Sequence, residues 1–135
     1  MKGFVDDIEK LTEENEDFRR VLYTGHHLQL VLMSLQPGEE IGEEVHEDRD
    51  QFFRIEEGEG EVVIDGVRHQ IEDDDAIIVP AGARHNIRNT GDDDLKLYTL
   101  YAPPHHAAHA PIIRAPQSPR LHDASAVAAR APAAP

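Results

Sequence analysis

The sequence predicts an all-β protein, a sandwich or barrel, in a chain of 135 residues that suits one domain. Between Arg20 and Tyr101, short runs rich in Val, Ile, Leu, Phe and Tyr are separated by Gly, Asp, Asn and Pro at intervals of about eight to twelve residues, as in successive strands and turns. No helical pattern of about 10–15 residues alternates with these runs, which disfavours a parallel α/β sheet. We therefore divide the chain into an N-terminal arm (1–19), a β domain (20–102) and a tail (103–135).

The N-terminal arm is predicted to form a short amphipathic helix. Its apolar residues Phe4, Ile8 and Leu11 have helical spacing, and many of the others are acidic. Residues 12–15 (Thr-Glu-Glu-Asn) indicate a turn that ends or restarts this helix.

The β domain is expected to contain strands joined by turns of identifiable chemistry. The predicted strands are residues 20–24, 27–36, 41–46, 51–57, 60–65, 67–71, 75–79, 85–88 and 95–101. Pro37-Gly38 suits a type II turn, and Asp65-Gly66 suits a two-residue type I′ hairpin. Residues 89–92 (Asn-Thr-Gly-Asp) are expected to close another hairpin.

The tail is rich in Ala and Pro and contains few large apolar residues. Such a segment cannot bury enough surface to offset the entropy lost on ordering, so we expect it to be flexible, with at most a local anchor at Ile112 and Ile113. His105, His106 and His109 lie in this segment and are interpreted as an adventitious, weak metal-binding patch.

Charge and composition exclude several functions. The chain has 27 Asp and Glu against 13 Lys and Arg, a formal charge of −14, which argues against nucleic acid and anionic membranes as partners. No run approaches the roughly 20 apolar residues of a membrane-spanning helix, and the N-terminus turns acidic too early for a signal peptide. We expect a cytoplasmic protein. Because the chain has no Cys, a metal ion would have to be held by His, carboxylate or amide groups.

Four polar residues have the spacing of a metal site. Along a strand, residues i and i+2 point to one face, so Glu44 and His46 present a carboxylate and an imidazole side by side. Gln51 follows a charged turn and can return beside them, and His85 follows a Pro-x-Gly turn at the start of another strand. Two imidazoles and one carboxylate are the ligand set of mononuclear non-haem metal sites.

These residues belong to two motifs that resemble those of the cupin superfamily. The first motif consists of Gly38, Glu44, His46, Gln51 and Gly58. The second consists of Pro80, Gly82, His85 and Asn89. The resemblance implies an antiparallel jelly-roll barrel over about residues 20–102, with one divalent ion (Zn, Fe, Mn, Ni or Co) in its mouth. Three positions depart from the pattern: Glu44 replaces the first His, Gln51 replaces Glu, and Asp74 replaces the leading Gly of the second motif.

Three functions are compatible with this pattern. The first is a metal-dependent isomerase or dioxygenase acting on a small oxygen-rich molecule such as a sugar, a keto acid or an enediol, with His26, His27 and Tyr98 as candidate bases. The second is a non-catalytic barrel that binds or senses a small ligand, and the third is a metal-free structural barrel. We also expect a homodimer in which the strand at 20–24 and the arm cover the neighbouring subunit.

Overall fold

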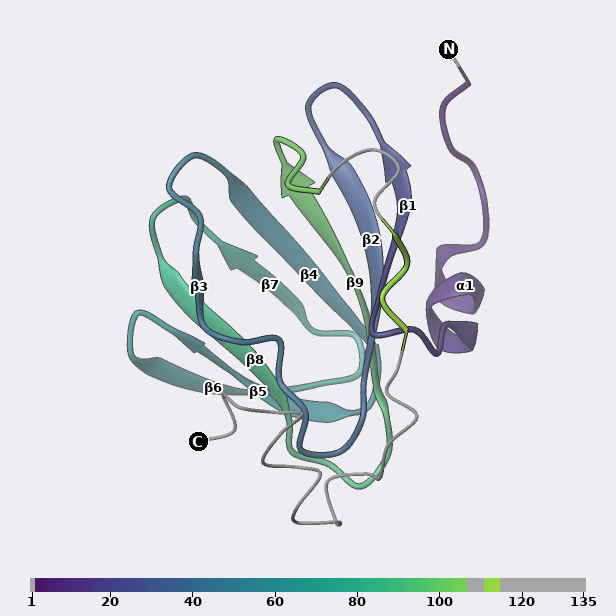
Figure 1. Cartoon of the computed structure of the whole chain (residues 1–135). Helices are drawn as coiled ribbons and strands as arrows, with labels where there is room; N and C mark the ends of the chain where they lie inside the picture. Colours follow the sequence, from purple (N-terminus) through teal and green to yellow (C-terminus); the bar gives the residue numbers. More distant parts are fainter. Residues whose placement is uncertain (1, 107–110, 115–135) are drawn as a thin grey trace.

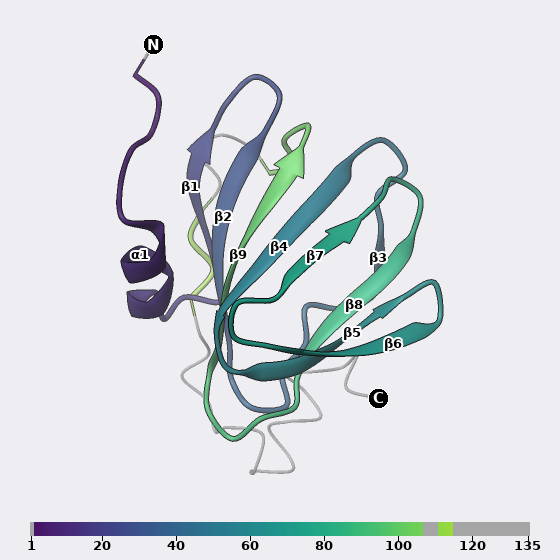
Figure 2. The same ribbon diagram turned by 180° about the vertical axis from the view of Figure 1, so that it is seen from behind.

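The protein is described by a computed structural model that covers residues 2–106 and 111–114. One helix and nine strands form within these residues (Figure 1): α1 (Ile8–Glu14), β1 (Arg19–Thr24), β2 (Gln29–Leu35), β3 (Glu44–Val45), β4 (Asp50–Glu57), β5 (Glu59–Ile64), β6 (Val67–Glu72), β7 (Ala76–Val79), β8 (Arg84–Asn89) and β9 (Leu95–Ala102). The strands make two antiparallel sheets that face each other, with orders β1-β2-β9-β4-β7 and β3-β8-β5-β6 (Figure 2). The predicted all-β jelly-roll fold is confirmed.

The core lies between the two sheets. Strand alternation places every second side chain of β4, β8 and β9 on the inner face, where Phe53, Ile87 and Leu97 are completely buried. Burial of such large side chains contributes roughly 1.5–3 kcal/mol each and provides most of the force that holds the sheets together. This packing makes the inner faces rigid supports for polar side chains at one end of the barrel.

Two of the predicted turns are confirmed. Asp65 and Gly66 have φ of 47° and 84°, the positive values that a type I′ hairpin requires, and they join β5 to β6. Gly38 has φ of 83°, and the amide of Glu39 donates to the carbonyl of Gln36 at 2.9 Å, as in a type II turn.

The predicted hairpin at residues 89–92 is wrong. β8 pairs with β3 and β5, whereas β9 pairs with β2 and β4, so the connection crosses from one sheet to the other. Asn89 stabilises this crossing: its side-chain amide donates to the carbonyls of Leu35 and Asp93, both at 2.8 Å. The sequence Asn-Thr-Gly-Asp indicates a change of direction but does not identify the strand that pairs next.

The predicted strand at 41–46 is also shorter in the structure. Only Glu44 and Val45 pair as a strand, preceded by an isolated bridge between Glu40 and Arg88. Gly42 interrupts the ladder because its φ of 105° is incompatible with extended pairing.

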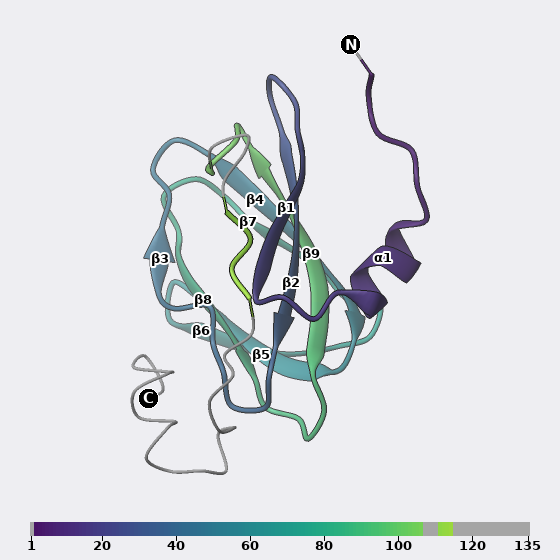
Figure 3. The same ribbon diagram turned by 45° about the vertical axis from the view of Figure 1, so that its right-hand side comes forward.

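Helix α1 covers part of the outer face of the larger sheet, beside β9 and β4 (Figure 3). Asp7 caps its N-terminus by accepting a hydrogen bond from the amide of Lys10 at 3.1 Å, and Asn15 is the C-cap. Lys96 of β9 donates from Nζ to the carbonyl of Asn15. The arm that we expected to cover a neighbouring subunit therefore packs against its own barrel.

The chain returns to the barrel after β9. Ile113 pairs with Arg19 on the free edge of β1, with hydrogen bonds of 2.8 and 2.7 Å between their backbones. Contacts with the barrel thus extend beyond residue 102, at which we expected the domain to end. His109 and residues 115–135 of the predicted tail lie outside the described residues. None of the helices in the described part of the chain has the length and apolar character to span a membrane.

Candidate metal centre

The candidate metal centre lies at the end of the barrel where the loop after β3 and the turn before β8 meet, uppermost in Figure 1. Glu44 and His85 are direct partners in the β3–β8 pair, and His46 follows β3 by one residue. One ligand atom from each of these three side chains lies within 4.8 Å of the other two. The structure therefore brings together three of the four residues in the predicted ligand set.

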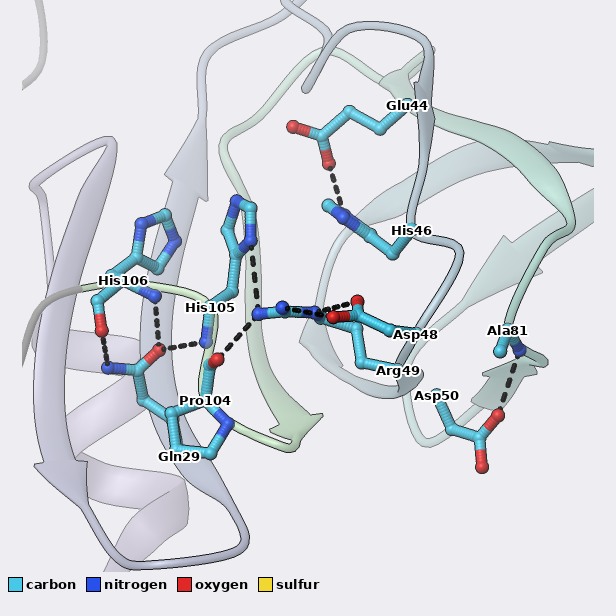
Figure 4. Close-up of polar contacts among 10 residues, drawn as sticks. All are labelled: Gln29, Glu44, His46, Asp48, Arg49, Asp50, Ala81, Pro104, His105 and His106. Atoms are coloured by element: carbon cyan, nitrogen blue, oxygen red, sulfur yellow. Dashed lines mark hydrogen bonds and ion pairs between the residues drawn. The ribbon is translucent and has the colours of Figure 1, made fainter.

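Glu44 and His46 interact directly. Nε2 of His46 lies 3.2 Å from Oε1 of Glu44, and the two side chains point toward each other (Figure 4). This is the side-by-side arrangement that alternation along a strand predicts. The His46 side chain is 10% exposed and that of Glu44 35%, so the pair lies where the barrel interior opens toward solvent.

His85 has the strongest indication of a missing partner. Its Nδ1 lies 3.2 Å from the carbonyl oxygen of Ala83 and donates to it, which leaves Nε2 with a lone pair. That Nε2 is buried and has no hydrogen-bond partner among the described residues. Burial lowers the pKa of His85 below its ordinary value, and the neutral imidazole that results is the form that binds metal ions. The residues present fit a divalent ion: two imidazole nitrogens and a carboxylate oxygen, with one imidazole oriented by a backbone carbonyl.

Gln51 lies on the inner face of β4, next to Tyr101 of β9 in the register. Its Nε2 donates to Oγ1 of Thr99 at 2.9 Å, and this hydroxyl in turn donates to the carbonyl of Phe52 at 2.8 Å. Its Oε1 is buried without a hydrogen-bond partner among the described residues. An amide oxygen left free in this way is available to a ligand, and we keep Gln51 as a proposed fourth metal ligand.

Two aromatic rings complete the surroundings of His46. Tyr101 is 4% exposed, and its ring meets that of His46 edge-on at 5.9 Å between centroids. Burial raises the pKa of Tyr101 well above its ordinary value, with the nearby carboxylate of Glu44 acting in the same direction, so the phenol stays protonated. The ring of His105 lies 4.6 Å from His46 and stacks on Tyr101 at 5.1 Å. The ring of Phe53 lies 6.1 Å from that of His85.

The segment after β9 is fastened over this end of the barrel by two side chains (Figure 4). Arg49 donates from Nη1 to the carbonyl of Pro104 and lies 3.4 Å from Nδ1 of His105. Gln29 accepts from the amides of His105 and His106, at 3.1 and 2.8 Å, and donates to the carbonyl of His106 at 2.8 Å. Sequence reasoning missed His105 and His106, which we placed in a flexible tail. The only available signal was their closeness to the end of β9.

The three candidate bases do not join the cluster. His26 and His27 are exposed in the loop between β1 and β2, and their rings stack on each other at 5.1 Å. Tyr98 lies on the outer face of β9, where its ring is 6.4 Å from that of Phe52. Tyr101, three residues later, occupies the inner face instead.

Two antiparallel sheets that enclose two imidazoles and a carboxylate define a small jelly-roll barrel with a candidate metal centre. The chain belongs to the cupin family, because the model of the cupin domain matches residues 31–101. This match includes all four predicted ligands.

The chain is also similar to individual proteins. The chain is 49% identical over 111 residues to the uncharacterized protein YrkC of Bacillus subtilis, a match that covers 78% of this chain but only 60% of that protein. It is 41% identical over 120 residues to an uncharacterized protein of Acanthamoeba polyphaga mimivirus, covering 85% of this chain and 74% of that protein. Among solved structures, the protein BH2720 of Bacillus halodurans is similar with a TM-score of 0.81 and 48% identity, over 84% of this chain and 89% of that chain.

Proposed function

We propose that this cupin binds one divalent ion through Glu44, His46 and His85, with Gln51 as a weak fourth ligand, and presents it to a small oxygen-rich molecule. The observation that carries the proposal is the buried Nε2 of His85, which lacks a hydrogen-bond partner among the described residues and belongs to the cluster formed with His46 and Glu44. Orphaned buried polar atoms are costly, and metal coordination would remove this cost. Zn, Fe, Mn, Ni and Co all suit such a ligand set.

In its catalytic form, the protein would be an isomerase or a dioxygenase that acts on a sugar, a keto acid or an enediol. The bound ion would supply Lewis-acid polarisation of a substrate oxygen or, in the case of iron, reactivity toward dioxygen. The chain itself would orient the substrate against Tyr101 and Phe53 and exclude water with the segment that Arg49 fastens. His105 is better placed than His26, His27 or Tyr98 to contact a molecule bound at the cluster.

The alternative is a barrel that binds or senses a small ligand without turnover. The phenol of Tyr101 favours this alternative, because its raised pKa makes it a hydrogen-bond donor and a poor base. The two functions share the same metal centre and differ in whether the metal-loaded protein converts its ligand.

The metal content of the purified, untagged full chain tests the proposal. Elemental analysis after reconstitution should give one divalent ion per chain, and His46→Ala and His85→Ala should each abolish stoichiometric binding. His69→Ala is the matched control, because His69 is exposed on β6. This strand and β3 are the two opposite edges of the smaller sheet. Retention of the ion by the His46 and His85 double variant would contradict the site. Turnover or simple binding of small oxygenated compounds by the loaded protein then separates the enzyme from the ligand-binding barrel.

We also propose that the chain forms a homodimer. On the outer face of the larger sheet, the exposed Ile78 of β7 lies beside Phe52 of β4, which lies beside Leu100 of β9, and the last two are half-buried. A row of apolar side chains that is open to solvent is typical of protein–protein contacts.

A further inference from the structure

Arg19 points into the barrel from the edge strand β1. It pairs in the register with Met33, a core residue that is 3% exposed, and cross-strand partners point to the same face. The Nε of Arg19 is buried and has no hydrogen-bond partner among the described residues. A guanidinium is always charged, and burying part of it without an acceptor is unfavourable.

Among the described residues, Arg19 has no acidic partner, although acids are abundant in the chain. The chain has 27 Asp and Glu. Within the described residues, five other arginines form ion pairs with them: Arg49, Arg54, Arg68, Arg84 and Arg114. Arg19 has no such pair among these residues, although it faces the interior. An anion that comes from outside the chain would satisfy it.

A second unsatisfied group faces the barrel interior. Nε2 of His106 is buried without a hydrogen-bond partner in the described part of the chain, and its ring meets that of Tyr101 edge-on at 5.2 Å. Burial lowers the pKa of His106 to about 4, and Arg19 is the charged group that contributes most to this lowering. Both groups adjoin the inner face of β2: Arg19 lies opposite Met33, and the backbone of His106 is held by Gln29, which lies four residues earlier on the same face and pairs with Tyr101.

We infer that Arg19 and His106 form a subsite for an anionic oxygen group, a carboxylate or a phosphate, of the molecule that the metal centre binds. The inference rests on the proposed function, which places the other end of that molecule, its metal-binding oxygen, at the metal centre. The planar guanidinium offers N–H donors in a fixed geometry that matches both groups, and charge-assisted hydrogen bonds of this kind are the strong ones. The substrate class thus narrows from oxygen-rich molecules in general to small keto acids or phosphorylated sugars.

Three ketones of three carbons test this subsite on the metal-loaded full chain. Pyruvate carries a carboxylate, dihydroxyacetone phosphate carries a phosphate, and dihydroxyacetone is neutral. NMR titration resolves millimolar dissociation constants for all three. We expect at least one of the two anions to bind more tightly than dihydroxyacetone, and the tighter of the two identifies the anionic group.

Arg19→Gln should weaken the preferred anion about tenfold, the effect of losing one charge-assisted hydrogen bond, and leave dihydroxyacetone unchanged. Arg19→Lys should retain part of the preference, because it keeps the charge, and it provides a folded variant if Arg19→Gln is unstable. Arg20→Gln is the matched control: it removes the same charge from the next residue of β1, which is exposed.

If Arg20→Gln weakens anion binding as much as Arg19→Gln does, the effect is one of overall charge and the subsite is overturned. Unchanged anion binding in Arg19→Gln would also overturn it, as would a wild type that binds neither anion. Metal content measured on the same samples separates the two proposals. If the wild type holds no ion but binds anions in an Arg19-dependent way, the metal proposal fails and the subsite stands. If the ion is present and Arg19→Gln changes nothing, the subsite alone fails.

Discussion

Gln51 stands where the cupin motif that this chain resembles has Glu. Its amide oxygen is free, whereas its amide nitrogen is committed to Thr99, whose own hydroxyl hydrogen goes to the carbonyl of Phe52. A carboxylate at this position would be a stronger ligand for a divalent ion but would place an oxygen where Thr99 now accepts a hydrogen bond.

We therefore expect opposite effects of Gln51→Glu with and without the ion. Metal affinity should rise by roughly tenfold or more, whereas the melting temperature of the metal-free protein should fall by a few degrees, about 1 kcal/mol. Gln51→Ala should bind the ion with reduced affinity. Competition titrations and thermal melts measure both quantities, and equal affinities in all three forms would show that Gln51 does not reach the ion.

Glu56 predicts a pH dependence of stability. Its side chain is only 4% exposed, belongs to β4, which α1 contacts, and has the guanidinium of Arg54 3.9 Å away. Burial raises the pKa of Glu56 above its ordinary value, Arg54 opposes the shift, and Glu9 of α1 adds to it. Because the folded state prefers the protonated carboxyl, the stability that this group contributes is present below the unfolded pKa and is lost as the pH rises through the folded pKa.

Glu56→Gln should accordingly raise the melting temperature at pH 7 by a few degrees, on the order of 1 kcal/mol, and have a smaller effect at pH 4. Glu59→Gln, at an exposed position of β5, should change little at either pH. Melting curves across this range measure the difference. A gain from Glu56→Gln that is as large at pH 4 as at pH 7 would contradict the ionisation argument.

At this scale, the sequence predicts Glu44, His46 and His85 because a local rule places them: alternation along one strand and a turn before another. It does not predict His105, because its position depends on contacts with two residues that are distant in the chain: Gln29 accepts a hydrogen bond from its amide, and Arg49 lies beside its ring. Strand parity places Tyr101, and not the candidate base Tyr98, on the inner face with Leu97.

Among the elements, helix α1 is too short to be stable alone and depends on its contact with the sheet. Lys96 is 7% exposed and donates to the carbonyl of the C-cap residue Asn15, where a cation also complements the negative end of the helix dipole. Lys96→Met keeps the aliphatic stem but removes this hydrogen bond. It should lower the melting temperature by roughly 5 °C, about 1 kcal/mol, and increase hydrogen exchange in α1.

Lys10→Met is the control for this prediction, because Lys10 is exposed on the same helix. Unchanged exchange in α1 after Lys96→Met would mean that other contacts hold the helix. The helix itself follows from the spacing of its apolar residues. The surface on which the helix packs cannot be predicted in this way, because it depends on which strands are central in the sheet.

The pairing of strands likewise combines local features that the sequence predicts with long-range features that it does not. Asp65-Gly66 is a local signal, because positive φ at both positions fits only one kind of turn between adjacent strands. The crossing at residues 89–92 has similar residues but joins strands of different sheets. Which strands pair is decided by packing of the whole core, in which Leu35 and Leu95 meet across the β2–β9 pair.

At the scale of the whole molecule, a homodimer must bury a surface that the single chain leaves exposed. We expected the arm and β1 to contact the neighbouring subunit. Both are already engaged within the chain, because α1 packs on its own sheet and Ile113 pairs with β1. The outer face of β7, β4 and β9 remains: Ile78 is 69% exposed and lies beside Phe52, which lies beside Leu100 in the register. A two-fold contact between two such faces would bury the same apolar row of each copy.

Light scattering of the full chain at micromolar concentration should therefore give the mass of a dimer. Ile78→Asp should give a folded monomer, because it places a charge on the most exposed side chain of the apolar row. Val67→Asp is the matched control: Val67 is also an exposed apolar residue, 57% exposed, but it lies on β6 in the other sheet, and this variant should remain a dimer. A monomeric wild type would contradict the dimer, and a dimer that survives Ile78→Asp would show that its interface lies on another face.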